Sequence, residues 1–169
     1  WMRLLKSVPQ SVLWLSTPSN LAMDNLRKQA QIHRVDANRL VFAKRELERA
    51  DHLSRLRLAD LFLDTPNFNA HTTAADALWA GVPVLTQMGN TFAGRVAASQ
   101  LTALGLPELI TNSAEEYFNK ALELANNPGA LKQIRAKQEA NRFISPLFNT
   151  KQYVADLEAV YRRLVKQIA

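Results

Sequence analysis

Short apolar runs and longer mixed stretches alternate along the chain. Runs of strand length are five in number: residues 11–16, 40–43, 60–64, 82–86 and 108–110. The other stretches have apolar residues every three to four positions and predict helices. Residues 1–7 have the spacing of the tail of a helix, and the further helices are 21–33, 46–57, a central one ending at 81, 95–104, 114–125, 130–143 and one from about 149 to the C-terminus. This alternation predicts an α/β fold with a parallel, doubly wound sheet and helices on both faces.

The central stretch, residues 69–86, predicts the end of a loop, a helix, a tight turn at Gly81 and a buried strand. In doubly wound sheets, ligands bind beyond the carboxyl ends of the strands, over the N-termini of helices. Four polar residues fall in this position: His71, Thr72, Thr73 and Asp76. Two hydroxyls and the free N–H groups of a helix start suit a phosphate anion, and the carboxylate suits sugar hydroxyls.

The same residues also allow a purely structural interpretation. Thr73 and Asp76 have the spacing of a capping box, with Asp in place of the usual Glu or Gln. If Thr73 were the N-cap, both side chains would be explained without a ligand.

Composition narrows the classes of partner. The 169 residues are 47% hydrophobic, have no cysteine, and carry a net charge of +6, which favours anionic ligands. The basic residues are scattered rather than gathered in a stripe, so we do not expect a nucleic-acid partner. We expect no membrane association and a cytoplasmic location, because the sequence has neither a membrane-spanning run nor a signal peptide. Since the chain opens on Trp1, we expect it to be a fragment.

Several common site motifs are missing from the sequence. There is no G-x-G-x-x-G fingerprint, no P-loop and no Asp-x-Asp pair to hold a divalent cation on a diphosphate. His33, His52 and His71 lie far apart and lack metal-ligand spacing. We therefore predict no metal site and no cofactor, and we find no nucleophile or general base in the chain.

Three segments resemble signatures of the O-linked N-acetylglucosamine transferases, the glycosyltransferase family 41 that includes SPINDLY-like members. They are residues 64–81, 91–101 and 145–153, and residues 11–15 are similar as well. The resemblance covers nearly the whole chain in the right order. It implies the C-terminal, UDP-binding lobe of a GT-B glycosyltransferase, in which two Rossmann-like lobes enclose the active site.

The resemblance also implies the reaction and the partners. The donor would be UDP-N-acetylglucosamine, the acceptor a protein Ser or Thr, and no metal would be needed. The acceptor would be recognised by an N-terminal lobe and tetratricopeptide repeats outside this chain. None of the catalytic residues would lie in the lobe that this chain forms. We expect residues 1–145 to form the nucleotide-sugar-binding lobe and 146–169 a crossing helix, whose apolar face would be exposed here and could support a homodimer.

Individual site residues follow from the same resemblance. His71, Thr72, Thr73 and Asp76 correspond to the residues that hold the diphosphate and ribose. A family Lys-x-x-His-x-x-Arg pattern near the uracil and phosphates corresponds to Arg49, His52 and Arg55, with Arg replacing Lys at the first position. Without the resemblance, these three residues would be read as a solvated helix face.

The alternatives differ in donor or in activity. Related protein glycosyltransferases use UDP-glucose or GDP-fucose. A non-catalytic nucleotide-binding or interaction module is the alternative from another functional class.

Overall fold

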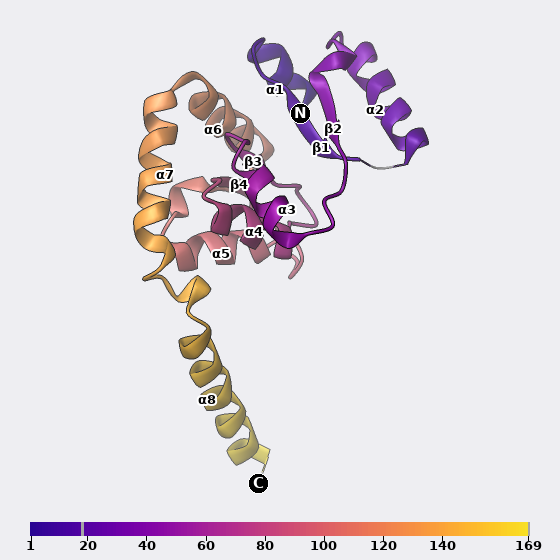
Figure 1. Cartoon of the computed structure of the whole chain (residues 1–169). Coiled ribbons are helices and arrows are strands. Elements are labelled where there is room, and N and C mark those ends of the chain that lie inside the picture. Colours follow the sequence, from indigo (N-terminus) through magenta and orange to yellow (C-terminus); the bar gives the residue numbers. More distant parts are fainter. Residues whose placement is uncertain (18, 169) are drawn as a thin grey trace.

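The structure, a computed structural model, describes residues 1–17 and 19–168 (Figure 1). The helices are α1 Met2–Ser7, α2 Asn20–Ile32, α3 Arg49–Leu56, α4 Thr72–Ala80, α5 Val96–Leu104, α6 Ala114–Asn126, α7 Pro128–Arg142 and α8 Thr150–Ile168. The strands are β1 Leu13–Ser16, β2 Leu40–Ala43, β3 Phe62–Leu63, β4 Val84–Gln87 and β5 Ile110–Thr111. Three short 3₁₀ turns complete the order: η1 Ala37–Arg39, η2 Pro107–Leu109 and η3 Pro146–Phe148.

Each predicted helix and strand forms, with ends shifted by a few residues. Serine hydroxyls cap two of the helices: Ser19 accepts from the N–H of Ala22, and Ser113 accepts from that of Glu116. Gly81 ends α4 in the left-handed conformation. The parallel α/β class is thereby confirmed.

The strands form two hydrogen-bonded groups. β1 pairs only with β2, and β3, β4 and β5 form a separate sheet with β4 in the middle. Every pair is parallel, with Leu13 opposite Leu40 and Phe62 opposite Val84. The parallel pairing agrees with the predicted fold, although apolar spacing identifies strands without showing which edges pair.

The larger core lies around β4 and the helices that cover it. Its fully buried members include Leu78, Val84, Leu85, Leu101 and Leu104. A smaller core joins α1, α2 and the β1–β2 pair. The two parts meet where the Arg3 guanidinium of α1 donates to Glu115 of α6 at 2.6 and 2.8 Å and stacks over Phe118.

α4 is fixed at its C-terminal end by α7. The buried side chain of Gln138 donates to the carbonyls of Leu78 and Val82, and Arg142 donates to that of Trp79. These bonds satisfy carbonyls that a helix end leaves without intrahelical partners. The N-terminal end of α4 therefore sits in a set position relative to β3 and β4.

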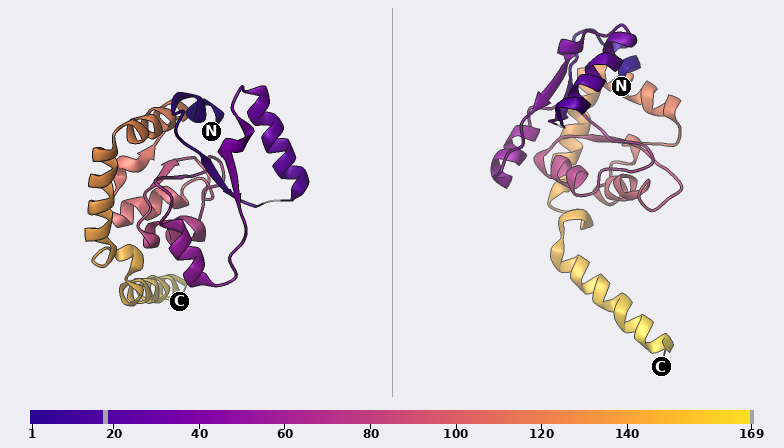
Figure 2. Two further views of the ribbon diagram at one scale, coloured as in Figure 1. Left: turned by 45° about the horizontal axis from the view of Figure 1, so that its top comes forward. Right: turned by 90° about the vertical axis from the view of Figure 1, so that its right-hand side faces the viewer.

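α8 projects away from the rest of the molecule (Figures 1 and 2). The predicted apolar side chains are largely at the surface: Tyr153 and Tyr161 are exposed, and Leu157 is half-buried. Polar residues occupy the rest of its circumference. Among the described residues, no helix combines the length and the apolarity needed to cross a membrane.

Two helix-ending glycines provide a test of this packing. Gly81 and Gly105 both have left-handed φ angles, of 87° and 77°. A Cβ atom at Gly105 would lie 2.8 Å from the amide nitrogen of Asn141, whereas one at Gly81 would meet nothing within 4 Å. We expect Gly81→Ala to lower the free energy of unfolding by about 1–2 kcal/mol through backbone strain. Gly105→Ala should cost about 1 kcal/mol more, because Asn141 must give up its bond to the Leu104 carbonyl. Equal costs in urea titrations would contradict this account.

Candidate functional site

The candidate site lies where β3 and β4 end and α4 begins. The segment after β3, residues 64–71, leads directly into α4, and α3 packs beside α4 (Figure 1). The predicted residues lie on these two neighbouring helices, and the contact that joins the two groups is the one between Arg49 and Asp76.

The N-terminus of α4 is open. α4 begins at Thr72, with His71 as an N-cap whose side chain makes no capping hydrogen bond. Thr72 and Thr73 are exposed in the first turn. Because Thr73 lies inside the helix rather than at the N-cap, the capping-box interpretation is wrong. The first N–H groups and two hydroxyls are left available to a ligand.

Asp76 lies one turn further along α4, and its carboxylate faces α3. It accepts a hydrogen bond from the Arg49 guanidinium at 2.8 Å. The Asp76 side chain is 15% exposed and that of Arg49 is 74% exposed. An ion pair with one partner so open to water contributes little to stability, so this contact can be exchanged for another at small cost.

Arg55 is held by the segment between β2 and α3. Its guanidinium donates to the Lys44 carbonyl and to Glu46, and lies 3.4 Å from Nδ1 of His52. It also approaches the ring of Trp14 on β1. Arg55 thus sets the position of His52 on the face of α3 that carries Arg49.

Sequence reasoning missed the residue that organises the segment before α4. Asp64 is 1% exposed, and its carboxylate accepts from the N–H groups of Thr65 and Ala70 at 2.9 and 2.7 Å. It also accepts from the Thr86 hydroxyl on β4, at 2.6 Å. An acidic residue directly after an apolar run, with a threonine ending the next run, was the available signal.

Burial sets the protonation behaviour of this carboxyl. Loss of hydration raises the pKa of Asp64, and its three hydrogen-bond donors and the nearby His71 only partly oppose that shift. Burial, reinforced by the Asp64 charge, raises the pKa of Tyr117, whose hydroxyl donates to the Asp64 backbone carbonyl at 2.9 Å. Tyr117 therefore remains a neutral donor and ties α6 to the end of β3.

Two aromatic rings that the sequence analysis did not single out flank His71. Phe68 stacks on the imidazole with centroids 5.1 Å apart, and Phe92 meets it edge-on at 6.2 Å. Both phenylalanine rings are exposed. The site therefore has an open, polar helix end bordered on one side by apolar surface.

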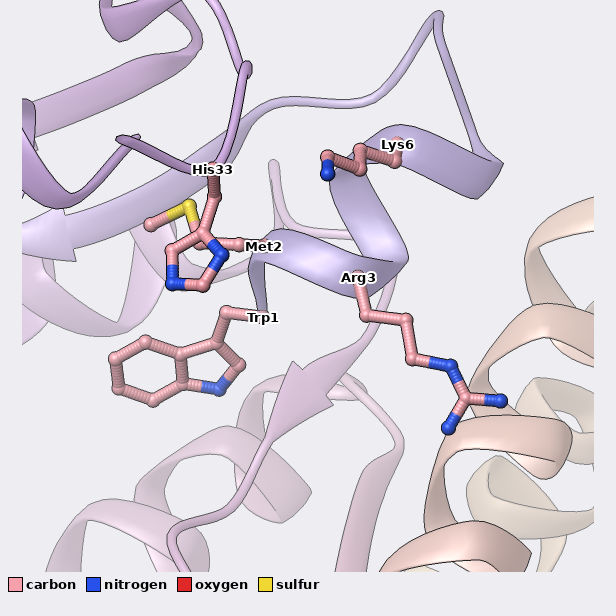
Figure 3. Close-up of a pocket in the computed structure, with 5 residues that line it drawn as sticks. All are labelled: Trp1, Met2, Arg3, Lys6 and His33. Carbon is pink, nitrogen blue, oxygen red and sulfur yellow. The ribbon is translucent and has the colours of Figure 1, made fainter. Parts of the chain in front are cut away.

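A separate pocket lies beside α1, lined by Trp1, Met2, Arg3, Lys6 and His33 (Figure 3). Arg3 points out of it, toward α6. None of the predicted site residues lines this pocket. Within residues 1–17 and 19–168, no group of three or more His, Cys, Asp or Glu side chains has a metal-binding arrangement.

Comparisons with known proteins point to one family. Residues 1–157 match the sequence model of glycosyl transferase family 41. The UDP-N-acetylglucosamine--peptide N-acetylglucosaminyltransferase of Caenorhabditis elegans is 38% identical over 99% of this chain, and the probable enzyme SEC of Arabidopsis thaliana is 39% identical over 97%. A mutant O-GlcNAc transferase of Thermobaculum terrenum superposes with a TM-score of 0.90 at 31% identity, over 96% of this chain.

These relatives are much longer than this chain. It spans 14% and 17% of the two curated proteins and 32% of the solved structure.

The Asp64 contacts lead to a stability prediction. Asp64→Ala leaves two backbone N–H donors and the buried Thr86 hydroxyl without an acceptor and should lower the free energy of unfolding by about 2–4 kcal/mol. Asp64→Asn keeps an acceptor and should change it by less than about 1 kcal/mol. Asp60→Asn is the control, because the Asp60 side chain is 90% exposed. Urea titrations of the three variants measure these differences.

The raised pKa of Asp64 adds a pH dependence. A folded-state pKa above the ordinary 3.8 means that the Asp64 contribution to stability is complete at low pH and is lost as pH rises through the folded value. Relative to Asp64→Asn, the unaltered protein should therefore lose stability as pH is raised from about 4 toward neutral. A constant difference in denaturant titrations across this range would contradict the burial argument.

Proposed function

Because the chain belongs to glycosyl transferase family 41, we propose that it is the UDP-sugar-binding lobe of a protein O-glycosyltransferase. The reaction is transfer of N-acetylglucosamine from UDP-N-acetylglucosamine to serine or threonine side chains. The observation that carries the proposal is the open N-terminus of α4, with exposed Thr72 and Thr73, beside the carboxylate of Asp76.

The diphosphate binds at the first turn of α4. The N-terminal end of a helix carries a partial positive charge and free N–H donors, and the two threonine hydroxyls add further donors. At the C-terminal end of α4, carbonyl groups already accept hydrogen bonds from Gln138 and Arg142. No metal ion is needed in this arrangement, since the helix end and the nearby cations supply the positive potential.

The uridine extends along α4 toward α3. Asp76 accepts hydrogen bonds from the ribose hydroxyls, and Arg49 turns from Asp76 toward the nucleotide. The uracil lies near His52 and Arg55, whose positions are fixed by the segment before α3.

The chemical step uses the same helix end. The bond from the anomeric carbon to the β-phosphate oxygen breaks, UDP leaves with the electron pair, and the acceptor oxygen replaces it. Negative charge grows on the phosphate as this bond breaks, so donors already aimed at it lower the barrier. The base that takes the hydroxyl proton lies outside these 169 residues.

The remaining parts of the enzyme complete the cleft. Residues 1–145 form the nucleotide-sugar-binding lobe, and residues 146–169, with the exposed apolar face of α8, contact the other lobe. The chain covers 32% of the solved O-GlcNAc transferase, which leaves room for that lobe and for segments that recognise the acceptor.

Substitutions at α4 test the nucleotide assignment. Thr73→Ala should weaken UDP binding about tenfold, because a hydrogen bond to a charged group is worth about 1.5–3 kcal/mol. Asp76→Ala should weaken UDP as well but leave inorganic pyrophosphate nearly unaffected, since Asp76 contacts only the ribose. Isothermal titration calorimetry measures both affinities, and thermal melts verify folding. Unchanged UDP affinity in folded Asp76→Ala protein would refute the ribose assignment.

Transfer activity provides a second test. We expect these 169 residues alone to transfer no sugar to a peptide, because both lobes are needed to orient donor and acceptor, and orientation supplies much of the rate. An assay with radiolabelled donor measures transfer to the peptide, and UDP-glucose and GDP-fucose are tested as alternative donors. Sugar transfer by this chain alone would show that the other lobe is not required and that the assignment of roles to the two lobes is wrong.

A further inference from the structure

The side chain of Gln100 on α5 holds the residue that precedes α4. Its Nε2 atom donates to the backbone carbonyl of His71 at 3.0 Å, and the N–H of Ala75 donates to the same carbonyl at 3.1 Å. The bond from Ala75 is the first ordinary hydrogen bond of the helix, whereas the bond from Gln100 comes from another element. The segment 91–101, which contains Gln100, supplies none of the proposed contacts with UDP, so this side chain acts on the site through the backbone of His71.

The amide group of Gln100 is only half satisfied. Its Oε1 atom is buried and has no hydrogen-bond partner within the described part of the chain. A buried acceptor without a donor costs free energy, and an apolar side chain of similar size would avoid that cost. The side chain is therefore suited to the donor that it offers, the Nε2 group, rather than to packing alone.

The helix that carries Gln100 is a rigid support. Ala97 and Leu104 lie about one turn before and after Gln100, and both are fully buried in the larger core. Leu101, the next residue, is fully buried as well. A donor carried by a packed helix holds its acceptor more precisely than a donor carried by a loop.

A fixed His71 carbonyl also orients the next N–H group. The carbonyl of His71 and the N–H of Thr72 belong to one planar peptide unit, which is trans, so the two groups point in opposite directions. Gln100 and Ala75 hold the carbonyl side of this unit. The Thr72 N–H, which has no acceptor within the helix, is thereby directed out of the open end of α4. That end is the proposed position of the diphosphate.

We propose that Gln100 is a positioning residue for UDP, because it directs the Thr72 N–H toward the diphosphate. The inference rests on the proposed UDP site. A donor that is fixed before the ligand arrives loses little freedom on binding. Donation to the carbonyl of a peptide also polarises that peptide and strengthens its N–H as a donor. The same fixed donor stabilises the charge that grows on the phosphate as the bond to the sugar breaks.

Comparison of UDP with uridine tests the proposal, because uridine lacks the diphosphate. In calorimetric titrations of this chain, Gln100→Met should raise the Kd of UDP about threefold to tenfold, as expected for the loss of one hydrogen bond. The Kd of uridine should stay within about twofold, since its proposed contacts are with Asp76, His52 and Arg55. In NMR spectra, the downfield shift of the Thr72 amide proton on addition of UDP should be smaller in Gln100→Met than in the unaltered protein.

Gln138 offers a matched control at the opposite end of the same helix. Its Nε2 atom also donates to a carbonyl of α4, that of Leu78, and its Oε1 atom is likewise buried without a partner among the described residues. Gln138→Met should lower the melting temperature at least as much as Gln100→Met, because Gln138 is fully buried, but should leave the ratio of the two affinities unchanged. Thr102→Val, which removes a hydroxyl that bonds within α5, is the control if Gln138→Met does not fold.

The outcomes distinguish this inference from the proposed function. If the unaltered protein binds UDP but folded Gln100→Met leaves the ratio of the two affinities unchanged, Gln100 has only a structural role and the UDP site stands. An equal loss of affinity for both ligands, or the same change of ratio in Gln138→Met, would also overturn the inference. Gln100→Leu provides the same comparison if Gln100→Met does not fold. If UDP does not bind the unaltered protein, the proposed function fails and the inference fails with it.

Discussion

The buried carboxylate of Asp64 is the interaction on which the site depends. It fixes both ends of the segment between β3 and α4, through Thr65 and Ala70, and fastens that segment to β4 through Thr86. A charged group with almost no exposure is tolerated only when its oxygens are well supplied with donors. Here the donors are the N–H groups of Thr65 and Ala70 and the Thr86 hydroxyl, which belong to the segments that the carboxylate holds in place. The free-energy cost of burying the carboxylate is therefore partly offset by bonds that also position the start of α4.

The two ends of α4 differ because of what packs against them. At the C-terminal end, α7 supplies side-chain donors to the last carbonyls, and Gly81 turns the chain into β4. At the N-terminal end, the His71 side chain makes no capping hydrogen bond, and its ring instead contacts the rings of Phe68 and Phe92. A helix stabilised by core packing can leave one end unsatisfied where solvent or a ligand reaches it. Leaving this end of α4 without capping bonds costs free energy, and the packing of Ala74, Ala77 and Leu78 in the core offsets that cost.

Periodicity and helix-ending residues were sufficient to predict the helices and strands, including the end of α4 at Gly81. The hydrogen-bonded neighbours of each strand were not predictable, because strand pairing depends on contacts distant in sequence. Spacing alone could not decide between a cap at Thr73 and a ligand site. One residue in the position of the helix start decides whether Thr73 can be the cap, and sequence patterns place helix ends less accurately than that. Asp64, Phe68 and Phe92 were missed because their roles arise only when the segments after β3 and β4 come together.

The contact between Arg49 and Asp76 connects the geometry of the site to its proposed use. A buried ion pair would resist a ligand, because breaking it strands a charge away from water. Arg49 is largely exposed, so water can solvate its guanidinium as soon as it leaves Asp76. Asp76, the more buried partner, would then need a new donor, and two adjacent ribose hydroxyls can supply it. Without a ligand, Arg49 supplies the hydrogen bond that the Asp76 carboxylate needs, and a ligand can replace Arg49 at small cost. This behaviour is expected of a residue that binds and releases a nucleotide in each cycle.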